Sequence, residues 1–315
     1  MKGELEVLNG GLITTVQDHG RHGYRKYGVP VSGVMDDHSC RLVNWLVGNS
    51  QHSPVIELTL MGGMFKFHSD AVVGISGAEA EVTVDKKSVA LNKTIRIKKS
   101  EILEIGRITA GCRVYLAIAG DWDIEQVMGS YSTCLAAKFG GFQGRPLKKG
   151  DRIRWQCDQQ KAVERMVPKK LLPHFSTRQT IRIIEGAEWD LMSEKQKPVF
   201  LETDFSISSQ SNRMGIRLEG TFTKLKSREE MVSSPVVPGI IQLPSSGLPI
   251  ILMKDAQSIG GYPRIAKVID ADLWRLGQIW TNNTIRFEHV SFKKAQELSK
   301  NYDELMSKLN FINLI

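Results

Sequence analysis

Apolar and polar residues alternate along short stretches of the first half of the chain, and glycines or polar turns separate these stretches. A period of two is typical of β-strands with one buried face, because successive side chains of a strand point to opposite sides. The stretches predicted as strands are residues 4–8, 12–16, 56–60, 65–67, 72–75, 95–97 and 114–119. Strands at this density, with few helical patterns between them, favour a barrel or a sandwich over a doubly wound sheet, so we expect an all-β fold.

The second half of the chain opens with a similar pattern, which suggests an internal duplication. A polar segment with two prolines, residues 158–180, is expected to link two domains. Residues 149–155 resemble residues 281–287, since each is a turn that leads into an alternating strand. We therefore expect two similar β domains, residues 1–165 and residues 166–315.

A few stretches have helical spacing instead. The aspartates at residues 36–37 can cap a short helix that ends at Gly48. Two more short helices are expected at residues 187–195 and 270–276. Apolar side chains recur at helical spacing over residues 292–309 and predict an amphipathic helix. We expect this helix to pack on the second barrel, and docking of a partner protein is the alternative.

The composition is that of an ordinary globular protein, with 315 residues of which 41% are hydrophobic and 24% charged. The net charge of +8 raises the question of nucleic acid or anionic membranes, but the basic residues are dispersed and form no recognisable binding motif. The four cysteines stand far apart without a C-x-x-C pair, which suits reduced thiols. The sequence begins without a signal-peptide pattern and contains no long apolar run. We expect a cytoplasmic protein that binds neither nucleic acid nor membrane.

The stretch at residues 239–267 concentrates much of the polar chemistry of the chain. Two apolar runs joined by a turn at Ser246-Gly247 predict a β-hairpin. At Gly260-Gly261 we expect backbone angles that other residues cannot adopt. The polar residues of the loop that follows the second run are Lys254, Asp255, Gln257, Ser258, Tyr262 and Arg264. A rigid strand that presents these groups suits a polar substrate, although an ordinary surface turn is equally compatible with the same residues.

Several blocks in one order, spread over residues 11–295, resemble the biotin-dependent carboxyltransferase family. These blocks are residues 17–21, 28–36, 46–49, 57–59, 129–133, 140–147, 211–218 and 239–263. The family includes the C subunit of 5-oxoprolinase, proteins similar to allophanate hydrolase subunit 2, KipA-like proteins and half of the urea carboxylase transferase domain. No single block is decisive, whereas all of them in this order are specific.

The resemblance implies two cyclophilin-like β-barrel domains and a companion protein. For the oxoprolinase branch it implies the C subunit of a complex that also contains KipI-like (B) and LamB/YcsF-like (A) subunits. Such a complex consumes ATP to open 5-oxo-L-proline to glutamate, and this chain alone is expected to be inactive. One alternative is carboxyl transfer from carboxybiotin to urea or a related amide. Another is regulation through binding of a kinase-inhibitor partner.

Asp255 is the first candidate for a catalytic residue, because a carboxylate at a strand end can act as a base or hold an amide N–H. Tyr262 is the second candidate, as a group that orients the amide. Arg213 and Arg217 lie four residues apart and are suited to anion recognition, with a structural salt bridge as the alternative. The other candidates for substrate binding are Gln242, Gln257, Arg264, Arg21, Arg145 and Ser132.

Other motifs argue against further cofactors on this chain. His19, His22 and His38 lie near one another in sequence, but no zinc-binding pattern includes them, so no metal is expected. Met253-Lys254 is similar to the core of a biotin attachment site, yet its flanking residues differ, so we expect no covalent biotin here. No phosphate-binding loop of the Gly-Lys-Ser/Thr type is present, which leaves the ATP site to the complex as a whole.

Two positions depart from the family pattern. Tyr131 stands where the family usually has an arginine, which puts an anion contact in doubt. Gly120-Asp121-Trp122 stands where a Gly-Gly pair is usual, so we expect the adjacent turn to have an altered shape.

Overall fold

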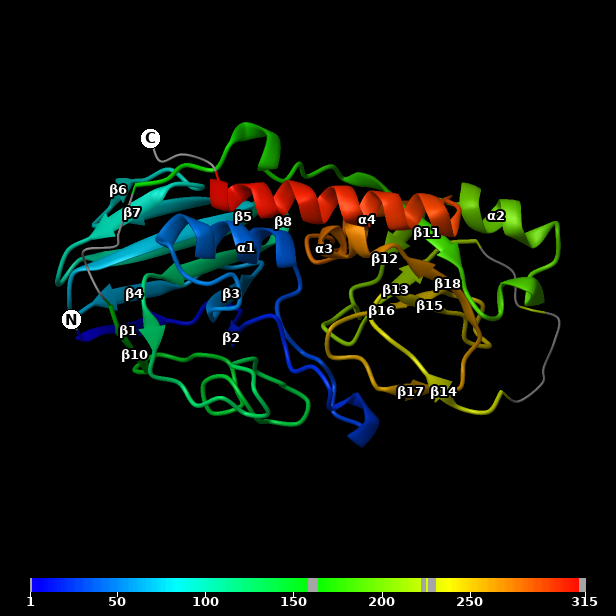
Figure 1. The fold of residues 1–315 in the computed structure, drawn as a ribbon, viewed down its shortest axis with the longest axis horizontal. Coiled ribbons are helices and arrows are strands. Elements are labelled where there is room, and N and C mark those ends of the chain that lie inside the picture. Colours follow the sequence, from blue (N-terminus) through cyan, green and yellow to red (C-terminus); the bar gives the residue numbers. More distant parts are fainter. Residues whose placement is uncertain (1, 158–163, 222–224, 226–230, 312–315) are drawn as a thin grey trace. The chain divides into compact units, whose positions relative to one another are not determined.

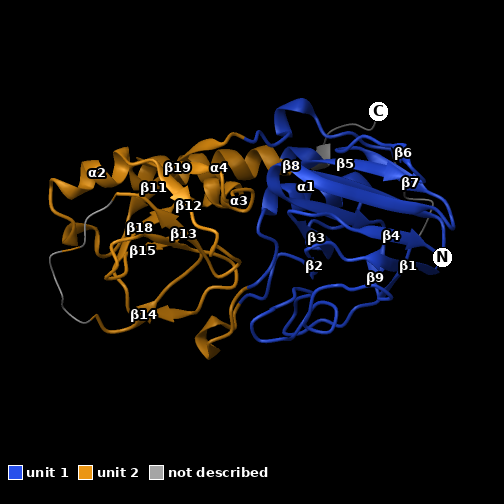
Figure 2. Cartoon of the chain, turned by 180° about the vertical axis from the view of Figure 1, so that it is seen from behind, with its two compact units in different colours: residues 1–22, 32–175, 308–315 blue, residues 23–31, 176–307 orange. Residues whose placement is uncertain are grey.

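The computed structural model describes residues 2–157, 164–221, 225 and 231–311. The chain forms two compact units (Figure 2). Unit 1 consists of residues 1–22, 32–175 and 308–315, and unit 2 consists of residues 23–31 and 176–307. The expected linker begins with residues 158–163, which lie outside the described residues. The domain boundary expected after residue 165 stays a prediction.

Unit 1 is built on a ten-stranded sheet that wraps around one apolar core (Figure 1). Its main path has the order β2-β3-β8-β4-β1-β10-β9, and β5 pairs with β6, β7 and β8. The strands are β1 (Lys2–Asn9), β2 (Ile13–Gln17), β3 (Val55–Thr59), β4 (Met64–Phe67), β5 (Ala71–Val84), β6 (Lys87–Ser88), β7 (Thr94–Ile97), β8 (Ile102–Ile118), β9 (Asp121–Trp122) and β10 (Arg152–Gln156). Because β8 is 17 residues long, one end pairs with β4 and the other with β3, which curls the sheet.

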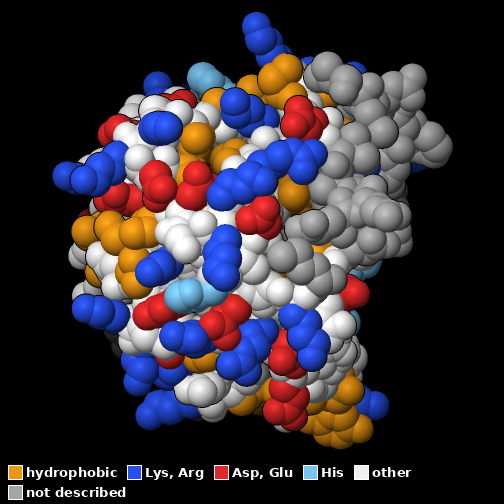
Figure 3. All heavy atoms as spheres, turned by 90° about the vertical axis from the view of Figure 1, so that its left-hand side faces the viewer, with side chains coloured by type: hydrophobic (Ala, Val, Ile, Leu, Met, Phe, Trp, Pro, Cys, Tyr) orange, Lys and Arg blue, Asp and Glu red, His pale blue; other side chains and the backbone are white. Residues whose placement is uncertain are grey.

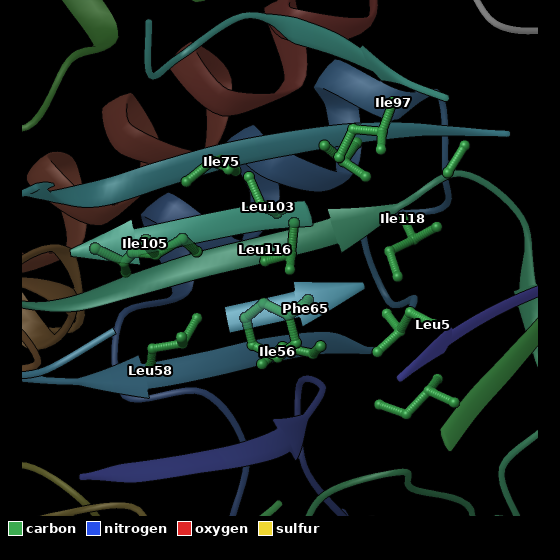
Figure 4. Packing of buried hydrophobic residues seen from close by; sticks show 14 of the residues in the cluster. Leu5, Ile56, Leu58, Phe65, Ile75, Ile97, Leu103, Ile105, Leu116 and Ile118 are labelled. Atoms are coloured by element: carbon green, nitrogen blue, oxygen red, sulfur yellow. The ribbon is translucent and has the colours of Figure 1, made fainter. Parts of the chain in front are cut away.

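The core of unit 1 is formed by the inward side chains of these strands. Figure 4 shows aliphatic residues of β3, β5 and β8 together with Phe65 of β4 on the inner face of the curled sheet. Leu5, Ile75 and Leu116 are fully buried. Burial of an aliphatic side chain of this size contributes about 2 kcal/mol each to folding. The period of two in the sequence therefore corresponds to a buried face, as expected.

Short helical elements complete the described part of unit 1. Helix α1 (Asp37–Val47) begins where the side chain of Asp36 accepts a hydrogen bond of 2.9 Å from the Ser39 backbone N–H. It ends at Gly48, whose φ of 75° lies in the left-handed region that glycine tolerates. The predicted helix at this position is confirmed. Two 3₁₀ helices, η3 (Lys169–Leu171) and η6 (Lys308–Phe311), also belong to this unit.

Unit 2 is a closed barrel of seven strands in the order β11-β18-β15-β16-β13-β12-β19. The strands are β11 (Arg178–Glu185), β12 (Phe205–Ile207), β13 (Gly215–Glu219), β15 (Ile240–Gln242), β16 (Ile250–Leu252), β18 (Arg264–Val268) and β19 (Thr284–His289). The parallel pairing of β11 with β19 closes the ring. Strands β15 and β16 form the predicted antiparallel hairpin. Together with the sheet of unit 1, this barrel confirms the all-β prediction.

A separate two-stranded ribbon, β14 (Ser234–Pro235) with β17 (Ile259–Gly260), lies at the lower edge of unit 2 in Figure 1. The helices of this unit are η1 (Arg25–Tyr27), η4 (Trp189–Leu191), α2 (Gln196–Glu202), η5 (Asp270–Asp272), α3 (Leu273–Leu276) and α4 (Phe292–Ser307). The amphipathic helix α4 buries Ala295 against Ile269 and Ala271, so it packs on the barrel as expected.

The helix expected at residues 187–195 is only partly present. A single 3₁₀ turn, η4, occupies the middle of this range, and the α-helix α2 begins afterwards at Gln196. Just before α2, the Gln196 side chain accepts hydrogen bonds from the backbone N–H and the hydroxyl of Ser193. The range expected at 270–276 does form two short helical turns, η5 and α3.

Charged side chains of both signs are dispersed on the surface, as the sequence indicates. On the face of unit 1 that Figure 3 presents, Lys and Arg side chains alternate with Asp and Glu. Of the four cysteines, Cys40, Cys112 and Cys134 are buried and Cys157 is half-buried. Among the described helices, none has the length and apolarity that a membrane crossing requires.

The Asp36 cap provides a test of the unit 1 fold. The carboxylate of Asp36 accepts hydrogen bonds from both the backbone N–H and the hydroxyl of Ser39, and Asp36 is fully buried. We expect Asp36→Ala to lower the free energy of unfolding by about 1–2 kcal/mol, measured by urea denaturation. Asp121→Ala at an exposed position is the matched control. A variant as stable as the parent would contradict the capping role.

Candidate active site

Asp255 and Arg213 form one ion pair at the ends of two adjacent barrel strands. β13 pairs with β16, so the residues before β13 lie beside those after β16. The Asp255 carboxylate accepts hydrogen bonds of 2.8 Å from Nε and 3.2 Å from Nη2 of Arg213. The Asp255 backbone N–H also donates to the Arg213 carbonyl over 2.9 Å. Asp255 is 5% exposed and the Arg213 side chain 11%. The forked pair therefore holds the Asp255 carboxylate in a fixed orientation in a mostly buried place.

Two side-chain amides meet beside the ribbon formed by β14 and β17. Gln242, at the end of β15, is buried and donates from Nε2 to the carbonyl of Tyr262 over 3.3 Å. A Cβ placed on Gly260 would lie 2.7 Å from Nε2 of Gln242 and 3.4 Å from Nε2 of Gln257. The two amides therefore converge on this glycine, and a larger residue would make the Gln242 amide shift.

The reason for a glycine at this place differs from the one expected from the sequence. We expected backbone angles that other residues cannot adopt at Gly260-Gly261. Neither residue is among the glycines with a positive φ. The structure instead places the end of the Gln242 side chain where a Cβ on residue 260 would lie, so a larger residue there would make this amide shift.

Tyr262 and Arg217 lie at the surface of the same unit. The Tyr262 side chain is 50% exposed. Arg217 is an exposed residue of β13 between the buried Ile216 and Leu218. Arg213 is bound to Asp255 before β13 begins, whereas Arg217 is exposed within β13.

Arg264 is held in a second forked pair, with Glu188. The Glu188 carboxylate accepts from Nε over 2.9 Å, from Nη2 over 2.7 Å and from the Arg264 backbone N–H over 2.8 Å. Nη1 of Arg264 donates to the carbonyl of Pro235 in β14 over 3.2 Å. The Arg264 guanidinium holds the pKa of the Glu188 carboxyl below its usual value of 4.5. The sequence gives no reason to single out Glu188, because it becomes a neighbour of Arg264 only in the folded barrel.

The candidates Arg21 and Ser132 lie in unit 1, where both are fully buried. The Asp18 carboxylate accepts hydrogen bonds from the hydroxyls of Ser130 and Ser132 and from the Tyr131 backbone N–H. Arg21 donates to the carbonyl of Ser132. These contacts hold residues 130–132 in place, and neither candidate faces solvent in this arrangement.

Arg145 also lies in unit 1, in a forked ion pair with Asp151. Its Nη1 and Nη2 donate to the Asp151 carboxylate over 2.6 and 2.8 Å, and its guanidinium lies 5.3 Å from the centre of the Phe142 ring. The pair joins the glycine-rich loop at residues 140–147 to the turn before β10. Arg145 is half-buried and keeps part of its surface accessible.

The two departures from the family pattern occupy structured positions in unit 1. Tyr131 is half-buried and packs against the apolar core, as a tyrosine ring can and a guanidinium cannot without a partner. Asp121 and Trp122 form β9, which pairs with β10, and Trp122 is buried. A short edge strand therefore follows Gly120 directly.

One arginine that the sequence reasoning missed also contacts this region. Arg25 of η1 belongs to unit 2 and donates from Nη2 to the carbonyls of Val236 and Gln257. No sequence signal distinguishes Arg25 from the other basic residues of its loop. Within the described parts of the chain, no group of three or more His, Cys, Asp or Glu side chains is arranged to hold a metal ion.

Comparison with known proteins agrees with this architecture over the whole chain. The family described as carboxyltransferase domain, subdomains A and B, matches residues 27–289. The C subunit of 5-oxoprolinase from Escherichia coli is 37% identical over 97% of this chain and 99% of its own length. The protein of the same name from Haemophilus influenzae is 34% identical over 98% of both chains. The chain belongs to this carboxyltransferase domain family, as the resemblance implied.

Larger relatives contain a similar region as one part of their chains. The urea amidolyase of Saccharomyces cerevisiae is 34% identical over 97% of this chain, which spans 18% of that enzyme. The crystal structure of the K. lactis urea amidolyase has a TM-score of 0.91 and 32% identity over 97% of this chain and 20% of its own. These likenesses connect the chain with urea-processing enzymes through one of their regions.

The Glu188–Arg264 pair predicts a pH-dependent contribution to stability. Because the folded-state pKa of Glu188 is lowered, the pair stabilises the fold above pH 4.5, and this contribution is lost as the pH falls below that value. We expect Glu188→Gln to lower the free energy of unfolding by about 1 kcal/mol at pH 7 and by much less at pH 3.5. Urea denaturation at both pH values measures the difference.

Glu297→Gln, which removes an exposed carboxylate of α4, is the control for this measurement. We expect it to change stability little at either pH. A Glu188→Gln effect of equal size at pH 7 and pH 3.5 would show that the charge of Glu188 contributes nothing.

Proposed function

We propose that the chain is the C subunit of a 5-oxoprolinase-type complex, which hydrolyses 5-oxo-L-proline to glutamate with consumption of ATP. The observation that carries this proposal is the end-to-end similarity to two proteins named as C subunits of 5-oxoprolinase, at 37% and 34% identity. A protein of this kind has partners by definition. In the proposal these are the KipI-like (B) and LamB/YcsF-like (A) subunits.

The overall reaction combines the lactam, ATP and water into glutamate, ADP and phosphate. In the proposal ATP first phosphorylates the amide oxygen of the ring, with release of ADP. Water then adds to the carbonyl carbon, the C–N bond breaks to leave the nitrogen as the amine of glutamate, and a second water releases phosphate from the acyl phosphate. Carboxylation of the amide, with bicarbonate as the carboxyl source, is the alternative activation. Activation is needed because an unactivated amide carbonyl is a poor electrophile. Since this chain contains no phosphate-binding loop of a familiar type, we assign ATP binding to the assembled complex, and this chain by itself is inactive.

Asp255 is the group that we assign to the amide N–H. Each oxygen of a carboxylate can accept more than one hydrogen bond, so the contacts to Arg213 leave acceptor capacity for substrate. Arg213 then orients Asp255 and keeps its negative charge balanced in a mostly buried place. The exposed Tyr262 and Arg217 are available to an incoming ligand, with the phenol as a donor and the guanidinium for an anionic group.

The amides of Gln242 and Gln257 complete this assignment. An amide side chain offers both a donor and an acceptor, which matches the N–H and C=O of a lactam. Gln242 is buried, whereas Gln257 is exposed and able to meet a ligand directly. The convergence of both at Gly260 supports one binding place for a small amide.

The experiment that tests the proposal is ATP-dependent release of glutamate from 5-oxo-L-proline. It is run with this chain alone, with its two partner proteins alone, and with all three together. We expect release only from the complete set. A correctly assembled complex that releases no glutamate would contradict the oxoprolinase assignment.

A second candidate function is carboxyl transfer from carboxybiotin to urea or a related amide. It is favoured by the family described as a carboxyltransferase domain and by the similarity to urea amidolyases. In this case carboxybiotin is carried by a companion protein and not by Lys254. This function predicts a biotinylated partner and activity that avidin abolishes, whereas oxoprolinase activity is expected to be insensitive to avidin.

The Asp255 assignment makes a prediction for the assembled complex. We expect Asp255→Asn to lower kcat by at least about 100-fold, because the amide cannot replace a carboxylate as a base or as a double acceptor. Asp270→Asn removes an exposed carboxylate of the same unit and is expected to leave kcat unchanged. Size-exclusion chromatography shows whether each variant still assembles. An assembled Asp255→Asn complex with full turnover would remove Asp255 from the mechanism.

A further inference from the structure

The side chain of Arg25 bridges the two strands of the ribbon at one end. β14 and β17 pair through Ser234 with Gly260 and Pro235 with Ile259. The Val236 backbone N–H then donates to the Ser258 carbonyl over 3.0 Å. Beyond this last bond Nη2 of Arg25 donates to the carbonyls of both Val236 and Gln257, the second over 3.2 Å.

The short segment that carries Arg25 is placed for this contact. Residues 23–31 belong to unit 2, although the chain before and after them belongs to unit 1. The turn η1 ends at Gly28, whose φ is 81°. The segment thus supplies unit 2 with a side chain that is distant in sequence, since Arg25 and Gln257 are 232 residues apart.

Arg25 differs from the other arginines of the candidate active site in its partners. Arg213 binds Asp255 and Arg264 binds Glu188, whereas in the described chain Arg25 has carbonyl acceptors and no carboxylate. Its Nη1 is buried and has no hydrogen-bond partner among the described residues. Burial lowers the pKa of Arg25. A guanidinium kept here without a balancing acid costs free energy, and both of its hydrogen bonds, from Nη2, are made to carbonyls at the end of the ribbon.

The ribbon region that Arg25 contacts includes Gln257, a residue of the candidate active site. Gln257 contributes the carbonyl that Arg25 holds, and its own side-chain amide lies beside Gly260 and near the amide of Gln242. The backbone of Gln257 determines where this amide points. We propose that Arg25 is a positioning residue of the candidate active site, which ties Val236 to Gln257 and so orients the Gln257 amide for substrate. The effect on substrate rests on the proposed function, whereas the tie, meaning the hydrogen bonds of Arg25 to Val236 and Gln257, does not depend on it.

The kinetic test uses the complete complex and compares Arg25→Met with Arg286→Met. Arg286 also donates to a backbone carbonyl of unit 2, that of Glu202, away from the ribbon. We expect Arg25→Met to raise KM for 5-oxo-L-proline about tenfold, the effect of losing one charged hydrogen bond, and to change kcat less than about twofold. Arg25→Lys is expected to recover part of this loss, and Arg286→Met to change neither constant.

A double-mutant cycle with Gln257→Ala separates positioning from general destabilisation. If Arg25 acts through Gln257, adding Arg25→Met to Gln257→Ala raises KM by less than about twofold further. Independent, multiplying effects would overturn the proposal, as would an Arg25→Met complex with unchanged KM.

Amide hydrogen exchange of this chain tests the tie without any activity. We expect Arg25→Met to speed exchange about tenfold in peptides that contain residues 234–236 and 256–260, and Arg286→Met to leave these peptides unchanged. Unchanged exchange in Arg25→Met would overturn the proposal. A parent complex without oxoprolinase activity but with this exchange pattern would contradict the proposed function and retain the tie.

Discussion

The parallel pairing of β11 with β19 is the constraint on which the architecture of unit 2 depends. Arg178 through Ile183 pair with Thr284 through His289, so the first and last strands of the barrel share hydrogen bonds. A closed ring leaves no strand edge free. The strands between them are therefore held on both sides, and the side chains at their ends occupy defined places. Asp255 and Arg213 lie where β16 finishes and β13 begins. Gln242 and Arg264 lie toward the opposite end of β16, where β15 finishes and β18 begins.

The charged groups of this site are oriented by partners within the protein. Arg213 is bound to Asp255 and Arg264 to Glu188, each in a forked arrangement. Such pairs limit the freedom of both side chains, so a ligand meets groups that already point in a defined direction. The same pairs balance charge that would otherwise be costly to bury. The same ion pairs therefore both fix the direction of these side chains and balance their charge.

Unit 1 uses buried polar contacts for a different purpose. Asp18 holds the loop at residues 130–132, and Arg21 donates to the same loop. Arg145 joins its glycine-rich loop to Asp151. Residues that resemble a binding motif in the sequence are in this case supports for the loops themselves. The assignment to a 5-oxoprolinase-type complex rests on similarity over the whole chain, whereas the roles of individual residues rest on the geometry of unit 2.

The sequence by itself determined the class of fold, because a period of two in apolar residues is a local property of each strand. It also determined the helix after Asp36, the hairpin of β15 with β16 and the family, whose motif blocks are read in chain order. Only the tertiary structure decided that Arg213 is bound to Asp255, that the amide of Gln242 lies beside Gly260 and that Arg21 is buried. The contacts of Arg213 and Arg21 join residues 42 and 111 positions apart in the chain. Contacts over such distances arise from barrel closure and sheet curling, which no local pattern encodes.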